Sequence, residues 1–331
     1  LVQESYIDEK LTLDKEALMR LSKYNALPTT LVFIAVFEGK VIATISQILD
    51  AGLGLPIEQF SDISKFRNTG KRLSEISGLA IEKSWRSRST GVYFPLTTFS
   101  MMYTITFVGV DQFFIVTKAR VRYFYQALYG FKSVDSQIKK YGFVNDVLSY
   151  SQYLNTDELK PFLKKYYEGV SLERNLYHII DGFPKNFPWR EQCAYSPLAY
   201  NLCSKLFFSP VDLDYFFNSQ SAQISDMDEK DIRVLKTTYH RQDYNEVISE
   251  RDFNYKEFRY FQRFEVFFRC EFYSENSTIK SAAKVFDVSE KGFAILFSPE
   301  DDIPDEFVGE IEVKAGELIK VRGKACWSNG R

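Results

Sequence analysis

Two arginines between an apolar run and a helix-like segment are candidates for binding a phosphate group. Arg86 and Arg88 lie in the sequence Trp85-Arg86-Ser87-Arg88-Ser89-Thr90-Gly91, which follows the apolar run 73–81. The first N–H groups of a helix have no partner within the helix and favour negative charge, and arginine adds charge-assisted hydrogen bonds. The alternative explanation of this turn is an ordinary strand–turn–helix unit with two solvated arginines.

A second pair of arginines comes late in the chain. Arg259 and Arg263 are four residues apart just before an apolar run, and Asp287 and Ser289 lie in an expected turn that Gly292 closes. Arginine planes bind phosphates as a fork and stack on guanine, while Asp and Ser can accept from and donate to a purine edge. The alternative is an arginine pair at a helix end followed by a generic Asp-x-Ser turn.

One carboxylate lies inside the first apolar run. Glu75 can act as a general base toward an amine, or bind the amine, if burial tunes its pKa. The alternative is a carboxylate near a strand end that forms a salt bridge.

The elements that position these N-terminal residues follow one another closely. The apolar runs 73–81 and 112–116 indicate buried strands. The segment from Val92 to about Phe107 indicates a helix, and residues 122–131 indicate a short helix that a glycine, Gly130, stops.

Before this core stretch, the β-rich segments 32–37 and 41–45 predict a hairpin, because Glu38-Gly39-Lys40 between them supplies a tight turn. Residues 1–24 are charged and helical in pattern. The chain begins at Leu1 rather than Met, so we expect a fragment of a longer protein.

After the core stretch, the pattern from 142 to about 225 indicates helices with many aromatic residues, interrupted by prolines. Residues 225–228 resemble a capping box that opens a helix through about Thr238. The charged segment 229–257 indicates an exposed connector between domains.

Composition excludes several classes of protein. The 331 residues are enough for two domains, and a net charge of -2 does not point to DNA or RNA. An aromatic content of 16% favours large cores and a pocket for apolar chains. With two histidines we expect no metal site, and we expect reduced cysteines in a cytoplasmic protein with no membrane span. The four cysteines are Cys193, Cys203, Cys270 and Cys326.

The N-terminal motifs resemble the GNAT acyltransferase superfamily. Residues 86–91 are similar to its pyrophosphate-binding loop, an Arg/Gln-x-x-Gly-x-Gly/Ala pattern, with Ser89 in place of the usual first glycine. Residues 124–131 resemble its closing helix, in which a tyrosine can protonate the leaving thiolate. The resemblance implies this role for Tyr125.

Residues 74–80 and 117–125 are more closely similar to the long-chain N-acyl amino acid synthases, relatives of the acyl-homoserine-lactone synthases. Gly78 stands where those synthases usually carry arginine. The resemblance covers about residues 1–135. It implies transfer of a long-chain acyl group from an acyl carrier protein or coenzyme A thioester to a small amine, which Glu75 would handle. The implied donor-binding residues are Leu79, Ala80, Ile81, Arg86, Arg88, Ser89 and Gly91.

The C-terminal motifs resemble the PilZ domain, a small β-barrel receptor for bacterial cyclic di-GMP. RxxxR and D/NxSxxG are both complete and in order, and residues 323–327 are similar to the family's tryptophan-bearing strand. The resemblance covers about 259–331. It implies cyclic di-GMP binding through Arg259, Arg263, Asp287, Ser289 and Gly292, in a barrel that we expect to be truncated at its C-terminus.

The sequence therefore predicts an α+β protein. A GNAT-like mixed sheet with flanking helices and a helical extension would occupy 1–225, a linker 226–258 and a PilZ barrel 259–331. The partners expected are acyl carrier protein, an amine such as an amino acid, cyclic di-GMP, and a membrane surface through the acyl product. One alternative is a catalytically degenerate scaffold that serves as a cyclic di-GMP receptor, and another is an acetyltransferase for a small amine or a protein.

Overall fold

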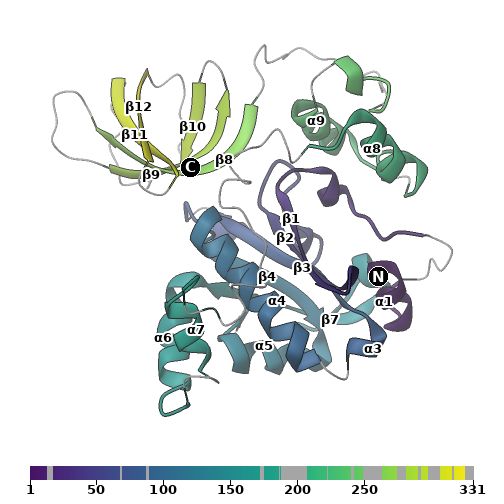
Figure 1. Ribbon diagram of the computed structural model, residues 1–331. Coiled ribbons are helices and arrows are strands. Elements are labelled where there is room, and N and C mark those ends of the chain that lie inside the picture. Colours follow the sequence, from purple (N-terminus) through teal and green to yellow (C-terminus); the bar gives the residue numbers. More distant parts are fainter. Residues whose placement is uncertain are drawn as a thin grey trace. The chain divides into compact units, whose positions relative to one another are not determined.

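The computed structural model describes residues 1–12, 18–67, 69–86, 89–171, 175–185, 187, 207–221, 223–239, 242–248, 263–273, 281–289, 292–296, 306–314 and 317–324. The chain divides into two compact units, each of which Figure 1 shows with its own sheet. The first holds the described residues of 1–64, 71–194 and 215–226, and the second those of 65–70, 195–214 and 227–331.

The first unit is built on a seven-stranded mixed sheet in the order β1-β2-β3-β4-β7-β5, with β6 also paired to β7. The β3–β4 pair is parallel and the other pairs are antiparallel. The strands are β1 Thr30–Phe37, β2 Lys40–Leu49, β3 Leu73–Ile81, β4 Gln112–Lys118, β5 Lys132–Ser133, β6 Lys139–Tyr141 and β7 Val147–Asn155.

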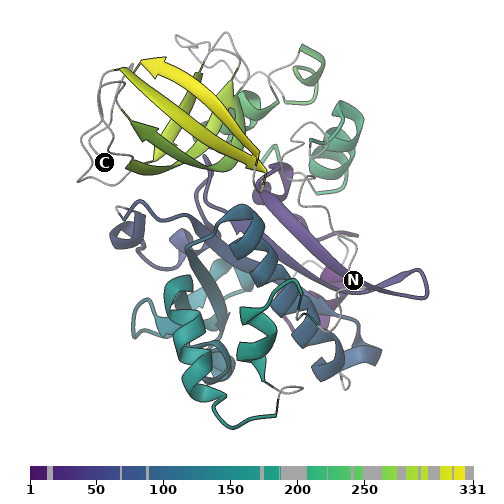
Figure 2. The ribbon, with the colours of Figure 1, turned by 60° about the vertical axis from the view of Figure 1, so that its left-hand side comes forward.

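Helices flank this sheet (Figures 1 and 2). The central helix, α4, buries Val92 and Leu96 against Ile42, Ala43 and Ile45 of β2. This apolar layer fixes α4 on the sheet. The helical elements of this unit are α1 Val2–Asp8, η1 Lys23–Ala26, η2 Pro56–Gln59, α3 Lys83–Arg86, α4 Ser89–Tyr103, η3 Thr104–Val108, η4 Ala119–Val121, α5 Arg122–Tyr129, η5 Gly142–Val144, α6 Thr156–Tyr166, α7 Leu176–Asp181 and η9 Tyr215–Ser219.

The structure confirms most of the elements predicted for the core stretch. The hairpin turns through Glu38 and Gly39, both at positive φ (48° and 76°), as a tight two-residue turn requires. Helix α5 ends at Gly130, where φ is 77° and a Cβ atom would lie 2.8 Å from the Phe162 ring. Only glycine fits that position. Helix α4 begins at Ser89, three residues earlier than predicted.

One prediction about the first unit is confirmed only in part, and another is wrong. In the segment 1–24, the described residues form only the short helix α1 and part of η1. Strand β7 lies in a segment predicted to be helical and pairs with β4 along Gln112–Lys118. Its buried positions include Ser149 and Ser151, while Leu148 is exposed, so its hydrophobic pattern is inverted.

The second unit contains α2 Ser64–Arg67 in part, α8 Pro210–Asp214, α9 Glu229–Thr238, η10 Gln242–Tyr244 and a five-stranded antiparallel sheet. The strand order is β10-β9-β8-β11-β12. The predicted helix after 225 is confirmed as α9, but Asp228 caps it, accepting from the Asp231 N–H at 2.8 Å. The strands are β8 Arg263–Tyr273, β9 Ser281–Ser289, β10 Gly292–Leu296, β11 Glu306–Lys314 and β12 Glu317–Lys324.

This sheet corrects one detail of the predicted turn. Asp287 and Ser289 lie within β9 rather than in a turn, because the strand continues to Ser289. Cys270, Val285 and Ile311 form part of a core on this sheet. The outer described strands, β10 and β12, are not paired with each other, so closure into a barrel remains a prediction.

Candidate active site

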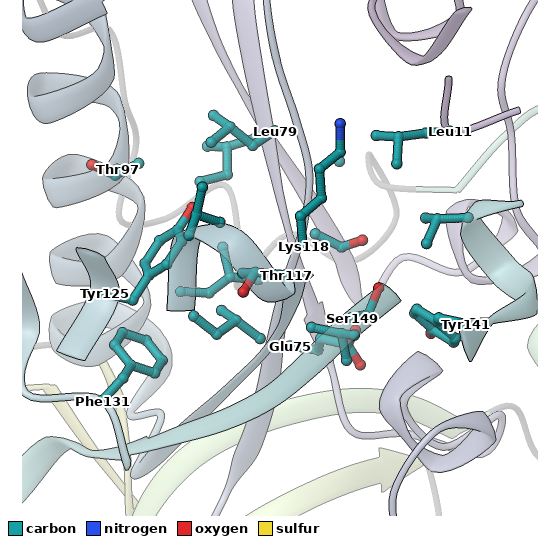
Figure 3. Close-up of a pocket in the computed structure, with 18 of the residues that line it drawn as sticks. Leu11, Glu75, Leu79, Thr97, Thr117, Lys118, Tyr125, Phe131, Tyr141 and Ser149 are labelled. Carbon is teal, nitrogen blue, oxygen red and sulfur yellow. The ribbon is translucent and has the colours of Figure 1, made fainter. Parts of the chain in front are cut away.

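The parallel strands β3 and β4 separate toward their C-terminal ends. They pair from Leu73 opposite Gln112 to Ile76 opposite Ile115, and then both continue without pairing. A cavity of about 280 Å³ lies between the separated ends (Figure 3). The residues that follow the last pair line it: Ser77, Gly78 and Leu79 of β3, and Val116, Thr117 and Lys118 of β4.

A β-bulge re-aims the backbone of β3 at this cavity. The β2–β3 pairing passes from Ser46 opposite Ser77 to Thr44 opposite Ala80, so two residues, Gly78 and Leu79, face one. Gly78 has a φ of 62°, and a Cβ atom there would lie 3.2 Å from the Ser46 Oγ. A bulge leaves residues outside the regular ladder. Gly78, at the position where the N-acyl amino acid synthases usually carry arginine, therefore shapes the cavity wall.

Glu75 lies in the wall of the cavity and is 3% exposed. Its Oε2 accepts a hydrogen bond from the backbone N–H of Ile57 at 2.6 Å. Burial raises the pKa of Glu75 to about 8; the Ile57 N–H opposes this rise and the charge of Glu58 adds to it. The carboxyl group therefore exchanges its proton near neutral pH, as a general base must.

Tyr125, from α5, lines the same cavity. Figure 3 shows Tyr125 and Thr97 on one side of the cavity, Tyr141 on the other, and Glu75 between them. Burial raises the pKa of the Tyr125 phenol, and the nearby Tyr93 hydroxyl opposes part of that rise. A phenol that keeps its proton at neutral pH can act as a general acid.

Two buried hydroxyl groups in this cavity, the Tyr93 Oη and the Thr117 Oγ1, make no hydrogen bond of normal geometry to the described residues, although the Tyr93 hydroxyl is near enough to Tyr125 to lower its pKa. Tyr93 is 8% exposed. A buried hydroxyl without a partner costs about 1–3 kcal/mol. A polar group of a bound ligand would remove that cost.

Sequence reasoning missed these polar wall residues. Tyr93 and Thr97 are four residues apart on α4, and Tyr125 and Tyr129 are four apart on α5, so each pair shares one helix face. The Thr97 and Tyr129 hydroxyl groups join the two helices at 3.1 Å. This four-residue spacing could have indicated that these side chains line a common cavity, but aromatic residues at helical spacing usually belong to a core.

The predicted donor-binding residues have different positions. Leu79 lines the cavity, whereas Ala80 and Ile81 do not; Ala80 pairs with Thr44 and Ile81 with Ala43. Arg88 lies outside the described residues, and Ser89 and Gly91 are in the first turn of α4.

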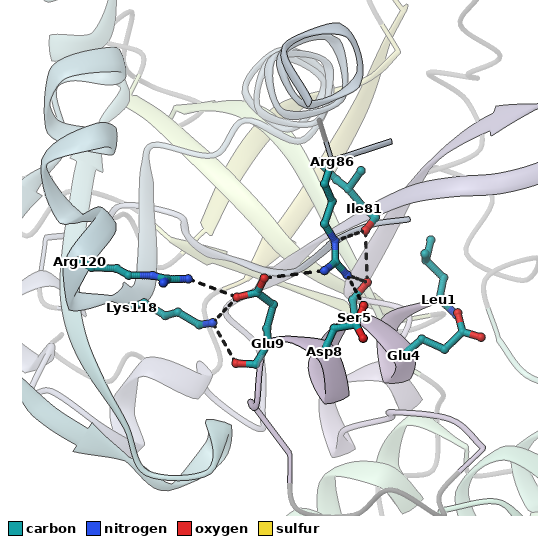
Figure 4. Close-up of polar contacts among 9 residues, drawn as sticks. All are labelled: Leu1, Glu4, Ser5, Asp8, Glu9, Ile81, Arg86, Lys118 and Arg120. Carbon is teal, nitrogen blue, oxygen red and sulfur yellow. Dashed lines mark hydrogen bonds and ion pairs between the residues drawn. The ribbon is translucent and has the colours of Figure 1, made fainter. Parts of the chain in front are cut away.

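The Arg86 guanidinium is engaged with α1 and the residue after it. Arg86 donates to the Ile81 carbonyl at 2.9 Å and pairs with Asp8 at 3.3 Å and Glu9 at 3.8 Å (Figure 4). Lys118 and Arg120 also contact Glu9.

In the second unit, backbone register brings three of the predicted cyclic di-GMP residues together. Arg263 is opposite Ser289 in the β8–β9 pair, and Ser289 is opposite Gly292 in the β9–β10 pair. Asp287 is two residues before Ser289 on β9. Arg259 lies outside the described residues.

The family comparison concerns the first unit. Residues 1–149 match the family model of the N-acyl amino acid synthase FeeM. The chain is an N-acyltransferase. This match contains the hairpin, both separated strands, the cavity and α5, and it agrees with the resemblance stated from the motifs.

Several solved structures are similar to the chain. A FeeM structure, an N-acyl amino acid synthase from uncultured soil microbes, has 23% identity, covers 48% of this chain and 89% of FeeM, and gives a TM-score of 0.42. A GNAT-family acetyltransferase from Streptococcus pneumoniae has 13% identity, with 46% and 89% coverage and a TM-score of 0.33. The coenzyme A-dependent acyl-homoserine lactone synthase BjaI has 10% identity, with 50% and 75% coverage and a TM-score of 0.33.

At these TM-scores the structural likenesses carry no weight for function, which depends on the family match. No curated protein matches the chain. In the part of the chain that the structure describes, no helix is long and apolar enough to cross a membrane, and no group of His, Cys, Asp and Glu residues could hold a metal ion.

Proposed function

We propose that the first unit transfers a long-chain acyl group from a phosphopantetheine thioester, carried by acyl carrier protein or coenzyme A, to the amine of an amino acid or similar small molecule. The observation that carries this proposal is the cavity between the separated ends of β3 and β4, which has both Glu75 and Tyr125 in its wall.

The lining of the cavity suits an acyl chain. It is mainly apolar, with Ile45, Ile76, Met101, Ile115 and Phe131 among its residues. Its volume of about 280 Å³ is nearly twice that of a cavity of about 150 Å³ that binds benzene, so it has room for roughly ten non-hydrogen atoms. It therefore holds the reacting end of a long chain, and the rest extends beyond it.

Glu75 and Tyr125 can carry out the two proton transfers that acyl transfer requires. The amine nitrogen attacks the thioester carbon, a C–N bond forms and the C–S bond breaks. The Glu75 carboxylate takes the proton that the amine loses, and Tyr125 gives its proton to the departing thiolate sulfur. Backbone N–H groups at the Gly78–Leu79 bulge are candidates to stabilise the carbonyl oxygen as it gains charge.

The test is product formation with purified chain, acyl carrier protein donors and a panel of amino acids, detected by mass spectrometry. Tyr125→Phe should lower turnover about 10²–10⁴-fold. Tyr123→Phe is the matched control, since Tyr123 lies on the same helix but is 64% exposed. Equal turnover of the Tyr125 variant would remove this residue from the mechanism. No N-acyl product with any donor would favour the scaffold alternative.

We also propose that the second unit is a PilZ-type domain that binds cyclic di-GMP and regulates the acyltransferase. The adjacent register positions of Arg263, Ser289 and Gly292 support a single ligand site. Each charge-assisted hydrogen bond contributes about 1.5–3 kcal/mol, so Arg263→Ala should weaken binding from about tenfold to more than a hundredfold.

Calorimetry on the full chain tests this second proposal, with cyclic di-AMP as control. Arg263→Lys should restore binding only in part, because lysine keeps the charge but loses the planar fork. Equal affinity for both dinucleotides, or no loss in Arg263→Ala, would refute the assignment.

A further inference from the structure

Three cationic side chains from three different elements meet on one carboxylate (Figure 4). The Glu9 Oε2 lies 2.6 Å from the Lys118 Nζ and 3.3 Å from an Arg120 Nη2, and the Oε1 lies 3.8 Å from the Arg86 Nη1. Lys118 also donates to the Glu9 carbonyl at 3.1 Å. Glu9 is thus the common partner of the cluster Arg86, Lys118 and Arg120.

The positions of these residues relate the cluster to the cavity entrance. Arg86 follows the end of β3, Lys118 is the last residue of β4, and Arg120 lies in η4 immediately after it. Lys118 also lines the cavity itself. Glu9 therefore bridges the two strand ends whose separation creates the cavity.

Helix α1 holds Glu9 in this place through a second set of contacts at the end of β3. The Ser5 hydroxyl donates to the Ile81 carbonyl at 3.4 Å, and Asp8 pairs with Arg86 at 3.3 Å. Together, α1 and Glu9 form a strap across the cavity entrance.

The ion pairs of Glu9 are weak, whereas α1 itself is held by the buried side chains of Gln3, Ser5 and Tyr6. The side chains of Glu9 and Arg120 are 40% and 73% exposed, and those of Lys118 and Arg86 are 20% and 29% exposed. Ion pairs at such exposure contribute little, because solvent screens them. Three cations face two carboxylates, Glu9 and Asp8. The same cations can donate hydrogen bonds to the oxygens of a phosphate group, which carries more negative charge than the single carboxylate of Glu9.

We propose that Arg86, Lys118 and Arg120 form the binding site for a phosphate ester at the cavity entrance, and that Glu9 occupies this site until the phosphate of the acyl donor displaces it. The identity of the phosphate as the donor's rests on the proposed acyltransferase function. The displacement of Glu9 breaks its bridge between the ends of β3 and β4 and opens the cavity to the donor's arm.

The experiment measures binding of phosphopantetheine by calorimetry to the full chain, without an amine present. Glu9→Gln should bind it about tenfold more tightly than the unmodified chain. Glu4→Gln should bind it equally to the unmodified chain, since Glu4 lies on α1 but pairs with the N-terminal amine and is 82% exposed. Adding Arg120→Gln to Glu9→Gln should remove most of the gain.

Binding of pantetheine, which lacks the phosphate, distinguishes a gain from the freed cations from a gain caused by a general opening of the cavity. Glu9→Gln should not improve its binding. An equal gain for pantetheine, no gain for phosphopantetheine, or a gain that persists without Arg120 would overturn the proposal. A chain that binds phosphopantetheine as expected but forms no N-acyl product would instead contradict the proposed function and leave this site standing.

Discussion

The buried carboxyl group of Glu75 allows a quantitative test by the substitution Glu75→Gln. The pKa of Glu75 is about 8 in the folded protein and 4.5 for an ordinary glutamate. Each pKa unit corresponds to about 1.4 kcal/mol, so ionising Glu75 in place costs on the order of 5 kcal/mol. Glutamine has the same shape, can still accept from the Ile57 N–H, and does not ionise.

The direction in which the free energy of unfolding changes with pH follows from proton linkage. Because the folded state binds the Glu75 proton more tightly than the unfolded state, the free energy of unfolding falls as pH rises from about 4.5 to about 8 and then levels off. The unmodified chain should therefore lose about 3 kcal/mol of stability relative to Glu75→Gln from about pH 5 to about pH 7.5, so that the variant becomes the more stable of the two.

Urea unfolding at a series of pH values measures this difference, with the exposed Glu4→Gln as control. The control should follow the unmodified chain across the range. Parallel curves for the unmodified chain and Glu75→Gln would refute the reasoning, because they would mean that Glu75 ionises in the folded protein as it does in the unfolded one.

Three further predictions concern the cavity and its loop. Gly78→Ala should cost about 1–2 kcal/mol of stability and reduce turnover, whereas Gly39→Ala, also at positive φ but with open space around it, should cost similar stability and leave turnover unchanged; equal turnover in both would exclude a catalytic role for the bulge. Tyr93→Phe should leave stability unchanged or raise it by up to about 1–3 kcal/mol, since the lost hydroxyl makes no hydrogen bond of normal geometry among the described residues. It should also raise the pKa of Tyr125 in an NMR titration, because the Tyr93 hydroxyl lowers that pKa; an unchanged Tyr125 pKa would contradict this. Ser89→Gly should leave donor binding equal or tighter in a titration, and a loss of about 0.5–1.5 kcal/mol would show instead that the serine hydroxyl binds the phosphate.

Local sequence patterns sufficed for the central elements of the first unit. The apolar runs of β3 and β4 and the glycine stop of α5 were predictable because the signals lie within a few residues of one another. Two candidate catalytic residues, Glu75 and Tyr125, line one cavity although fifty positions separate them.

The features that could not be predicted depend on contacts distant in sequence. The sequence of strand β7 lacks the usual hydrophobic–polar alternation of a strand because the buried positions include serines. One of them, Ser151, contacts Ser61 at 2.8 Å. The sequence alone contains no sign that Arg86 is paired with carboxylates, because its partners Asp8 and Glu9 lie far from it in the sequence, near the start of the chain. The conformation of Gly78 follows from a register shift against β2, which no local motif encodes.

The unpartnered hydroxyl groups of Tyr93 and Thr117 have a consequence for hydration. A cavity of about 280 Å³ has room for on the order of ten water molecules, and these two groups give some of those waters fixed partners in an otherwise mainly apolar lining. An acyl chain that enters must release this water, which favours burial of its methylene groups but strips both hydroxyls of their hydration. A plain hydrocarbon cannot replace those hydrogen bonds, whereas a thioester or amide carbonyl can. We therefore expect the cavity to discriminate against free alkane chains and to favour chains that carry a carbonyl group at the depth of Tyr93 and Thr117.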